Sequence, residues 1–383
     1  MPYIPIELNR HFAALESSYG VVPNFAPSNA FHALKTDLEL QQEYLERKDI
    51  TGSRSFAGIA GSGRRQGQFQ IDAYMVPSSN LAPFFQSACG GVPQSFAGGQ
   101  VTAGCTESTL LFAAPHGLAI GQAVGYGGEL RFVTAVGSST QVTVDPPFSS
   151  APPAAAMITP TVSYPLAASL PSVAIYDAWT PPTAQQRILC GGCVDQMEIN
   201  VQGDFHQVKF QGKAQDLIDS VTFAAGQGGL SSFPAAPSSQ SITGAPLAGN
   251  LGQIWLGDPA ARFSTLARAR LVLANNLDLR GNEFGSEIPL AAVPGPRQVT
   301  LDFEVFELDD ASHRALYAAA HGRTPLAAHL QLGAATGGLF AAYLKNVVPQ
   351  VPKYATNERQ LRWSFTGSRA AGADDDELWI AAG

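Results

Sequence analysis

Two stretches of the chain repeat the same order of hydrophobic and polar positions. Apolar and polar residues alternate over most of Gln68–Val76, and they alternate again over Gln298–Phe306. A period of two predicts a strand with one buried face and one solvated face. Each strand is followed by a polar or acidic break and then by a short apolar segment that ends in glycine, at Gly90 and at Gly322. We therefore expect one strand–turn–helix unit in two copies.

Residues that can cap a helix lie in both breaks, and further matches follow in the same order along the chain. The cap candidates are Ser79 or Asn80 in the first copy and Asp309 or Asp310 in the second. Asp72 aligns with Asp302, and the later matches are Phe210–Gly212 with Phe365–Gly367, and Phe223–Gly226 with Ile380–Gly383. The later pairs are closer together by about 75 positions, which indicates an insertion of that size after the first helix. The sequence thus predicts a duplicated domain.

This duplication gives the domain boundaries and the fold class. We expect a first domain at 1–90 and 165–226, an inserted small β module at 91–164, a linker at 227–250 and a second domain at 251–383. Strands dominate both copies, so the predicted fold is mainly β, with two tandem sandwich or barrel domains that each carry a flanking short helix.

Several connecting segments stand out by length or composition. Residues 1–47 form a predicted N-terminal arm, in which Leu34–Arg47 has a helix-forming composition. Residues 48–66 in the first copy and 278–296 in the second are long polar loops. Loops of this length in compact domains are usually functional or are ordered by a neighbour.

The bulk composition restricts the function. The chain has 383 residues, 45% hydrophobic but only 14% charged, and a formal net charge of −8. An acidic protein is a poor match for tight, sequence-independent DNA binding, which needs lysine and arginine for phosphate. No apolar run is long enough for a membrane span, and the first residues lack the pattern of a signal peptide. We expect synthesis and assembly in a cytoplasm, with no membrane partner.

No motif of an enzyme or cofactor site stands out. The seven histidines have no metal-ligand spacing, and the four cysteines are too few for a disulfide scaffold. Cys190-Gly-Gly-Cys193 has the form of a zinc or redox half-site, but it equally suits a tight glycine turn. Asp374–Glu377 could bind a hard cation or form a solvated loop, and Gly58–Gly63 lacks the lysine of a phosphate loop. We expect no enzyme, no cofactor and no metal.

At the duplicated unit the chain resembles the major tail tube proteins of long-tailed, siphovirus-like bacteriophages. Glu16–Pro23 resembles the opening of that family, and Gln68–Val76 with its helix resembles its first tube strand. Val194–Ile199 with Val208–Gly212 resembles its paired strands, and the second copy repeats the pattern from Gln298 to Gly322. The resemblance covers most of the chain outside 91–164 and rests on pattern rather than on invariant motifs.

The resemblance implies a structural virion protein of the tail, with no catalytic role. Such subunits form rings whose strands join into a barrel around a commonly acidic lumen, and stacked rings make the hollow tube through which DNA passes without specific binding. It also implies a tape measure protein, a tail tip and tail terminator proteins as partners. Two domains per chain suggest trimeric rings with pseudo-sixfold symmetry; a hexamer stays open.

The polar strand faces and the long loops supply the residues with expected roles. The candidates for the lumen wall are Gln70, Asp72, Glu198, Asn200, Thr300, Asp302 and Glu304. The candidates for contact between rings are Asp49, Thr51, Arg54, Arg64, Arg65, Arg280, Asn282 and Glu283. An alternative function is a virion-surface or adhesin-type sandwich that binds carbohydrate, although the four tryptophans are dispersed along the chain. A hydrolase has the least support.

Overall fold

The fold is mainly β, as the sequence predicts. The computed structural model describes residues 3–46, 49–50, 52–55, 58–76, 80–201, 203–238, 244–355 and 359–383. Strands make up most of the regular structure in these residues, and only two α-helices accompany them. The strand pairs are antiparallel throughout the described part of the chain.

The first body of the molecule is built around a strand that changes partner halfway along its length. Its elements are β1 (Asn9–Leu15), β2 (Ala30–Phe31), β3 (Lys35–Glu46), β4 (Ile59–Tyr74), α1 (Ala82–Cys89), β13 (Val173–Trp179), β14 (Arg187–Val201), β15 (Gln207–Ala214) and β16 (Asp216–Asp219). β1 pairs with β13, and β13 pairs with the first part of β14. β14 also pairs with β16 and then with β15, which continues to β4 and β3.

The second body repeats these pairings strand for strand. Its elements are β17 (Gly252–Gly257), β18 (Ala261–Arg262), β19 (Leu266–Ala274), β20 (Asp278–Leu279), β21 (Ala292–Val293), β22 (Gln298–Phe306), α2 (Ala311–Gly322), β23 (Leu326–Leu332), β24 (Phe340–Val348), β25 (Lys353–Ala355), β26 (Arg362–Ala370) and β27 (Trp379–Ala382). β17 pairs with β23, and β23 with β24. β24 also pairs with β27 and β26, which continues to β22 and β19. We infer that the chain contains one topology twice.

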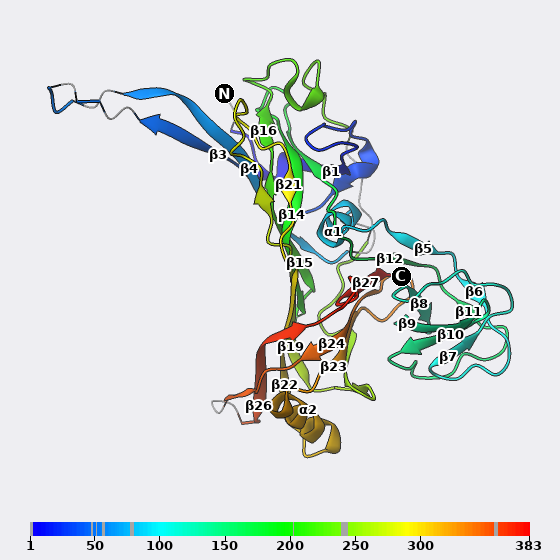
Figure 1. Cartoon of the computed structure of the whole chain (residues 1–383). Coiled ribbons are helices and arrows are strands. Elements are labelled where there is room, and N and C mark those ends of the chain that lie inside the picture. Colours follow the sequence, from blue (N-terminus) through cyan, green and yellow to red (C-terminus); the bar gives the residue numbers. More distant parts are fainter. Residues whose placement is uncertain are drawn as a thin grey trace.

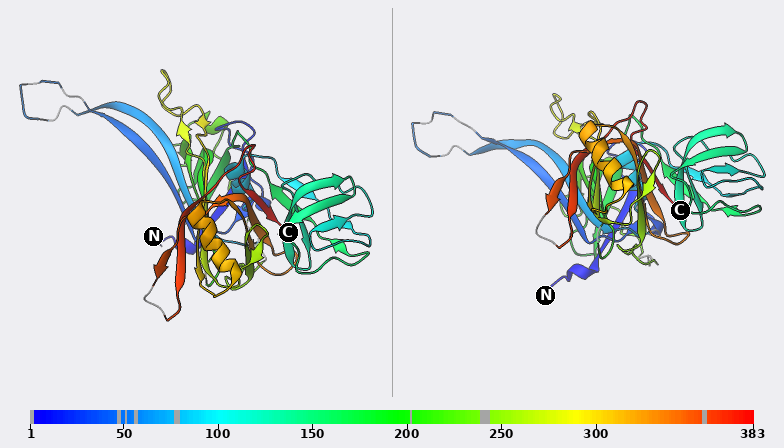
Figure 2. Two further views of the ribbon diagram at one scale, coloured as in Figure 1. Left: turned by 60° about the horizontal axis from the view of Figure 1, so that its bottom comes forward. Right: turned by 90° about the horizontal axis from the view of Figure 1, so that it is seen from below.

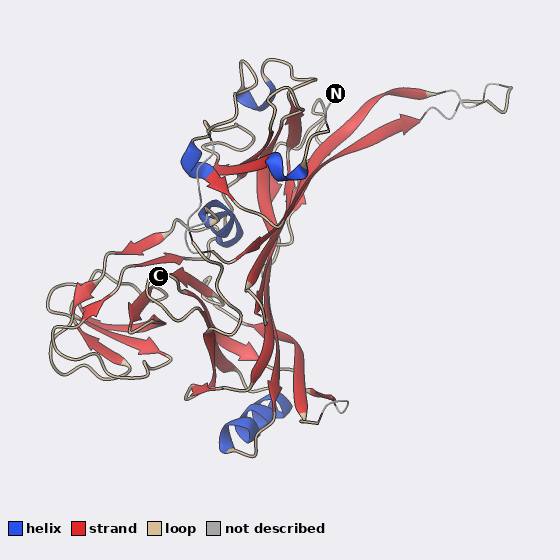
Figure 3. Ribbon diagram, turned by 180° about the vertical axis from the view of Figure 1, so that it is seen from behind, coloured by secondary structure: helices blue, strands red, loops and turns tan. Residues whose placement is uncertain are grey.

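The two bodies share one continuous sheet and one core. β14 of the first body pairs with β19 of the second, so the sheet runs in the order β3–β4–β15–β14–β19–β22–β26–β25 (Figures 1 and 3). Its inward side chains form a single hydrophobic cluster with the two helices. Phe85 of α1 lies 5.2 Å from Phe340 of β24, centroid to centroid, which joins the cores of the two bodies.

The helices follow their sequences, with two differences from prediction. The N-cap of α1 is Leu81, which makes no side-chain cap hydrogen bond, so Asn80 is not the cap, and Ser79 lies outside the described residues. α1 ends before Gly90, which has a φ of +94°, a conformation that glycine adopts without strain. The N-cap of α2 is Asp310, as predicted, and its carboxylate accepts a hydrogen bond from the His313 amide. It continues through Gly322, however, and the residue with left-handed backbone is Arg323. The predicted glycine stop of the second helix is therefore wrong by one position.

The inserted segment forms a small β module with a core of its own. Its elements are β5 (Gln94–Phe96), β6 (Gly99–Gln100), β7 (Thr109–Leu111), β8 (Ala123–Tyr126), β9 (Glu129–Ser138), β10 (Gln141–Asp145), β11 (Met157–Ile158) and β12 (Thr161–Tyr164). β7, β10, β9 and β8 form one sheet over an apolar cluster that includes Phe112 and Phe148. β12 pairs with β5 and also with β27, so this segment of the first copy is attached to the second body.

In each body the strands that lie away from the continuous sheet have an outer face, and different segments cover it. These strands are β1, β13, β16 and the first part of β14 in the first body, and β17, β23, β27 and the first part of β24 in the second. In the first body, Phe25, Phe223 and Phe233 pack against Tyr176 and its neighbours. In the second body, β8 and β9 of the module cover Ala341, Tyr343 and Trp379. Part of the predicted linker thus lies on the first body, because Phe233 is 6.0 Å from Tyr176.

The structure corrects two of the sequence matches and one segment. Because Leu301 opposes Ser368 as Ile71 opposes Phe210, the equivalent of Phe210 is Ser368 rather than Phe365. β27 takes the place of β16, so Phe223–Gly226 is not its counterpart. Leu34–Arg47, which has a helix-forming composition, contains the strand β3.

β3 and β4 continue beyond the body as a long hairpin. In Figure 1 this hairpin extends away from the sheet, and the module lies on the opposite side of the molecule. The views in Figure 2 show the same arrangement. β4 is 16 residues long, whereas its counterpart β22 has 9, so the projection is a feature of the first body alone.

Candidate functional site

One face of the continuous sheet is polar across both bodies. On β15 the burial alternates, with Val208 and Phe210 buried and Lys209 and Gln211 half-buried. The same alternation occurs on β14, where Glu198 and Asn200 lie between the buried Met197, Ile199 and Val201. Since side chains alternate across a strand, the polar residues of neighbouring strands share one face.

All seven residues predicted for the lumen wall lie on this face. Gln70 and Asp72 are on β4, Glu198 and Asn200 on β14, and Thr300, Asp302 and Glu304 on β22. Hydrogen bonds connect Gln70 to Asp72 and to Gln211, and Asn200 to Glu198. The structure therefore brings together residues from three strands that are far apart in the sequence, although Glu304 is buried.

Cationic side chains accompany the carboxylates on this face. Arg270 of β19 lies between Glu198, at 2.5 Å, and Asp302, at 3.6 Å. Glu304 contacts both Arg268, at 2.6 Å, and Arg362, at 3.3 Å. Further along the sheet Lys35 pairs with Asp37. Each of these carboxylates contacts a lysine or arginine, so this face carries charges of both signs.

Sequence reasoning missed these cations, although a signal was present. In Leu266–Ala274, Arg268 and Arg270 alternate with Ala269 and Leu271, which is the same period of two. Lys209 follows the same rule on β15. The strand patterns could have placed these side chains on the polar face, but only the pairing of β14 with β19 brings Arg270 next to Glu198.

The Arg270 contact changes the acidity of Glu198. The hydrogen bond from Arg270 holds the pKa of Glu198 below its ordinary value, against the opposing effect of burial. The same bond raises the pKa of Arg270. A carboxylate with a depressed pKa in the folded state stabilises the fold above its unfolded pKa, and this contribution disappears as the pH falls through the folded value.

Replacing Arg270 with alanine is expected to return the pKa of Glu198 towards its ordinary value. The stability difference between the wild type and Arg270→Ala should be largest near neutral pH and should vanish in acid, below the pKa of Glu198. Urea unfolding at a series of pH values measures this difference. Arg369→Ala, on the same face, is the control, and a pH-independent difference for Arg270→Ala would contradict the assignment.

The residues predicted for contact between rings fall into two groups: some lie at the tip of the β3–β4 hairpin, and the others make contacts within the same chain. Asp49 and Arg54 lie at the tip of the β3–β4 hairpin, and Thr51 is outside the described residues. Arg64 and Arg65 belong to β4 itself, and they contact the loop between β19 and β22 of the same chain. Arg64 donates to Asn282 at 2.8 Å, and the Arg65 amide donates to the Glu287 carbonyl.

The loop of the second body is thus anchored to the first body. Arg280 pairs with Glu283 within the loop, and Gln215 donates to the Pro289 carbonyl. Arg65 also makes a two-point contact with Asp216 at 3.0–3.1 Å. The β3–β4 hairpin projects furthest from the molecule, and the loop between β20 and β21 also extends outwards, with Phe284 fully exposed.

Both ends of the continuous sheet have an edge without a strand partner among the described residues. β3 pairs with β4 alone, and β25 pairs with β26 alone. β3 has 12 residues, and Tyr44 and Leu45 on its outer part are exposed. An edge of this kind is a template for pairing with another chain.

The cysteines and the acidic run take structural roles. Cys190 and Cys193 lie in β14, where this strand changes partner from β16 to β15. Their thiols are free and buried, and burial raises the pKa of Cys193 to about 12. Asp375 and Glu377 both bind Arg297. No group of three His, Cys, Asp or Glu in the described ranges is placed to hold a metal ion.

Comparison with known proteins adds no relative. No model of a known protein family matches the sequence, and a search of curated proteins finds no similar chain. In the part of the chain that the structure describes, neither helix combines the length and apolar character needed to cross a membrane.

Proposed function

We propose that this protein is a structural subunit of a bacteriophage tail tube, which polymerises into stacked rings around a channel for DNA. The observation that carries the proposal is the junction between the two bodies, where the last part of β14 in the first body pairs with β19 in the second. Among the described residues, this series ends with a free edge on β3 and another on β25. Repeating the junction between copies closes a ring, which removes both edges.

Three copies would supply six bodies around the ring, with the polar face of the sheet towards the channel. DNA phosphates bind where lysine and arginine side chains are available to neutralise them. On this face Arg268 and Arg270 already contact Glu304, Glu198 and Asp302. Paired charges, rather than an acidic wall, would keep the channel from holding DNA. A tape measure protein inside the tube, with tip and terminator proteins at its ends, completes the proposal.

The carbohydrate-binding alternative receives no support from the tryptophans. Trp363 and Trp379 are buried in the second body, Trp255 is on β17 of the same body, and Trp179 is on β13 of the first body. A sugar-binding surface usually presents exposed aromatic rings, and these four do not form one.

Electron microscopy of the purified protein tests the proposal, with the β3–β4 hairpin as the contact between rings. Ile50 at the hairpin tip is fully exposed, and Ile120 on the module is also exposed. We expect the wild type and Ile120→Asp to form tubes, and Ile50→Asp to form rings that do not stack. A protein that stays monomeric at high concentration would overturn the proposal, and tubes of Ile50→Asp would overturn the role of the hairpin.

A further inference from the structure

The internal junction of the chain shows how the edges of two bodies meet. In the β14–β19 pair, Asn200 lies opposite Arg270 and Val201 opposite Ala269. The turn after β14 then contacts the segment that leads into β17. His206 donates from its amide to the Leu247 carbonyl, and Gly249 donates to the Asp204 carbonyl. The first body thus contributes the last part of β14 and its turn, and the second contributes β19 and the segment before β17.

The strand pairings identify which residues take the same places at the outer edges. Asp72 and Asp302 occupy equivalent places, and they pair with Lys35 and Arg270, so β3 is the counterpart of β19. Gln207 and Ser364 are also equivalent, because they pair with the equivalent residues Tyr74 and Glu304. They pair in turn with Asn200 and Lys353, so β25 is the counterpart of the last part of β14. The offset is supported independently at the other end of β24, where Phe340 opposes Ala382 as Arg187 opposes Asp219.

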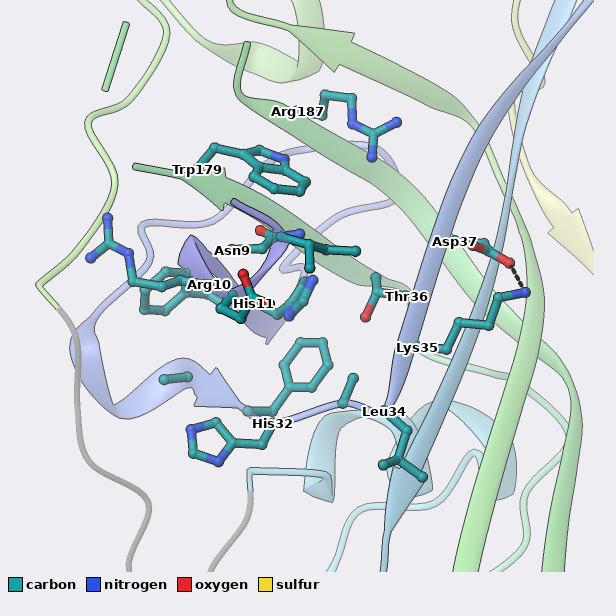
Figure 4. Close-up of a pocket in the computed structure, with 16 residues that line it drawn as sticks. Asn9, Arg10, His11, His32, Leu34, Lys35, Thr36, Asp37, Trp179 and Arg187 are labelled. Carbon is teal, nitrogen blue, oxygen red and sulfur yellow. Dashed lines mark ion pairs between the residues drawn. The ribbon is translucent and has the colours of Figure 1, made fainter. Parts of the chain in front are cut away.

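A cavity lies beside β3, the free edge strand that is the counterpart of β19. It has a volume of about 550 Å³ and is lined by β1, by β2, by the start of β3, by the end of β13 and by the start of β14 (Figure 4). Buried polar atoms of four lining residues have no hydrogen-bond partner among the described residues: Asn9 Oδ1, Arg10 Nε, His11 Nε2 and Thr36 Oγ1. Such atoms are costly to leave unpaired in a finished assembly.

Exposed apolar side chains accompany both surfaces. Next to β3, Ile6 is 75% exposed and Leu34 is 49% exposed. On and after β25, Tyr354 is 52% exposed and Leu361 is 41% exposed. Ile6 lies just before β1, and Leu247 lies just before β17, the counterpart of β1. Leu247 is buried at the internal junction, whereas Ile6 is exposed.

We propose that β25 of one copy pairs antiparallel with β3 of the next copy, with Lys353 opposite Lys35 and Tyr354 opposite Leu34. This inference rests on the proposed ring and specifies its partner surface and register. The end of β25 and Leu361 then face the cavity between β1 and β3, as the turn after β14 faces the segment from Leu247 to Leu251. Lys35 keeps Asp37 as its partner on its own strand, which offsets the opposing Lys353.

Disulfide trapping tests the register. Directly opposite residues on antiparallel strands have Cα atoms about 4.5–5.5 Å apart, within disulfide range, whereas diagonal neighbours are about 7–8 Å apart. All variants carry Cys105→Ser, because Cys89, Cys190 and Cys193 are buried and Cys105 is only partly covered. The test variant is Lys35→Cys with Lys353→Cys, and the control is Asp37→Cys with Lys353→Cys, which shifts one cysteine by two residues on the same exposed face.

We expect the test variant to form cross-linked dimers and trimers under mild oxidation, at least tenfold more than the control, on a non-reducing gel. Rings in the microscope without cross-links in either variant would overturn the register and leave the proposed function standing. Preferential cross-linking of the control would also overturn it. Wild-type protein that forms no oligomer at all would overturn the proposed function together with this inference.

Discussion

Replacing Thr36 with proline is expected to leave the protein folded but unable to form rings. At the internal junction the Asn275 amide donates to the Asp195 carbonyl, so alternate residues of β19 back to Leu271 direct their amides towards β14. Thr36 takes the place of Leu271, since Thr36 opposes Ile71 as Leu271 opposes Leu301. Its amide therefore points to the free edge, and proline removes a donor that only a neighbouring copy would use.

The loss recurs at every contact of a ring. A hydrogen bond withdrawn from a buried ladder costs about 1–3 kcal/mol when its acceptor is left unpaired, and three contacts repeat that cost around a trimer. Light scattering during gel filtration should show trimer for Ile50→Asp, whose rings are expected not to stack, and monomer when Thr36→Pro is added to it. Thr36→Val keeps the backbone amide, so it should assemble as the wild type does. Thr36→Pro rings of normal stability would show that β3 is not an assembly edge.

The paired charges of the polar face change the physical picture of a DNA channel. A strongly acidic wall would repel phosphate but would also repel itself across a narrow bore. The polar face sets three arginines against the three carboxylates that they contact, and these charges cancel: Arg268, Arg270 and Arg362 against Glu198, Asp302 and Glu304. If this face lines the proposed channel, it would neither attract nor strongly repel DNA, which suits passage better than binding.

The sequence predicts the strands best where one face of a sheet is buried and the other is wet. Gln68–Val76 and Gln298–Phe306 show this alternation, and β4 and β22 follow it. These patterns are local, so they can be recognised without knowing the partner strand.

The errors arise where a partner decides the structure. The leucine-, glutamine- and glutamate-rich β3 has good helix formers, but its pairing with β4 overrides that propensity. The similarity of Phe223–Gly226 to Ile380–Gly383 reflects small residues shared by chance, because β16 and not this turn pairs like β27. The contacts of Arg64 with Asn282 join residues 218 positions apart, which no local pattern reveals.

One buried arginine of the module contacts the second body. Arg131 of β9 is fully buried, and its guanidinium contacts Glu129 at 2.9 Å and Gln331 at 3.1 Å. It also lies 5.3 Å from the Trp255 ring of β17. Burial lowers the pKa of Arg131 to about 10, so it remains charged at neutral pH. Hydrogen bonds from Ser149 hold the pKa of Glu129 below its ordinary value despite burial.

Replacing Arg131 with methionine is expected to destabilise the protein by about 3–5 kcal/mol, because it leaves a buried carboxylate without its cation. Gln331 and Gln253 of the second body would lose their contact with the guanidinium as well. Hydrogen exchange should increase in β9 and in the facing strand β24, and limited proteolysis should release the module first. Urea unfolding measures the free energy.

A second substitution separates the lost charge pair from the lost packing. Glu129→Gln removes the uncompensated charge, so the double variant Arg131→Met, Glu129→Gln should recover part of the stability that Arg131→Met loses. If the double variant is no more stable than Arg131→Met, packing of Arg131 against Phe148 and Trp255 accounts for the effect rather than the ion pair. If neither variant is destabilised, the module is attached through β12 and β27 and through the apolar contacts of Phe132 with Tyr343 and Trp379.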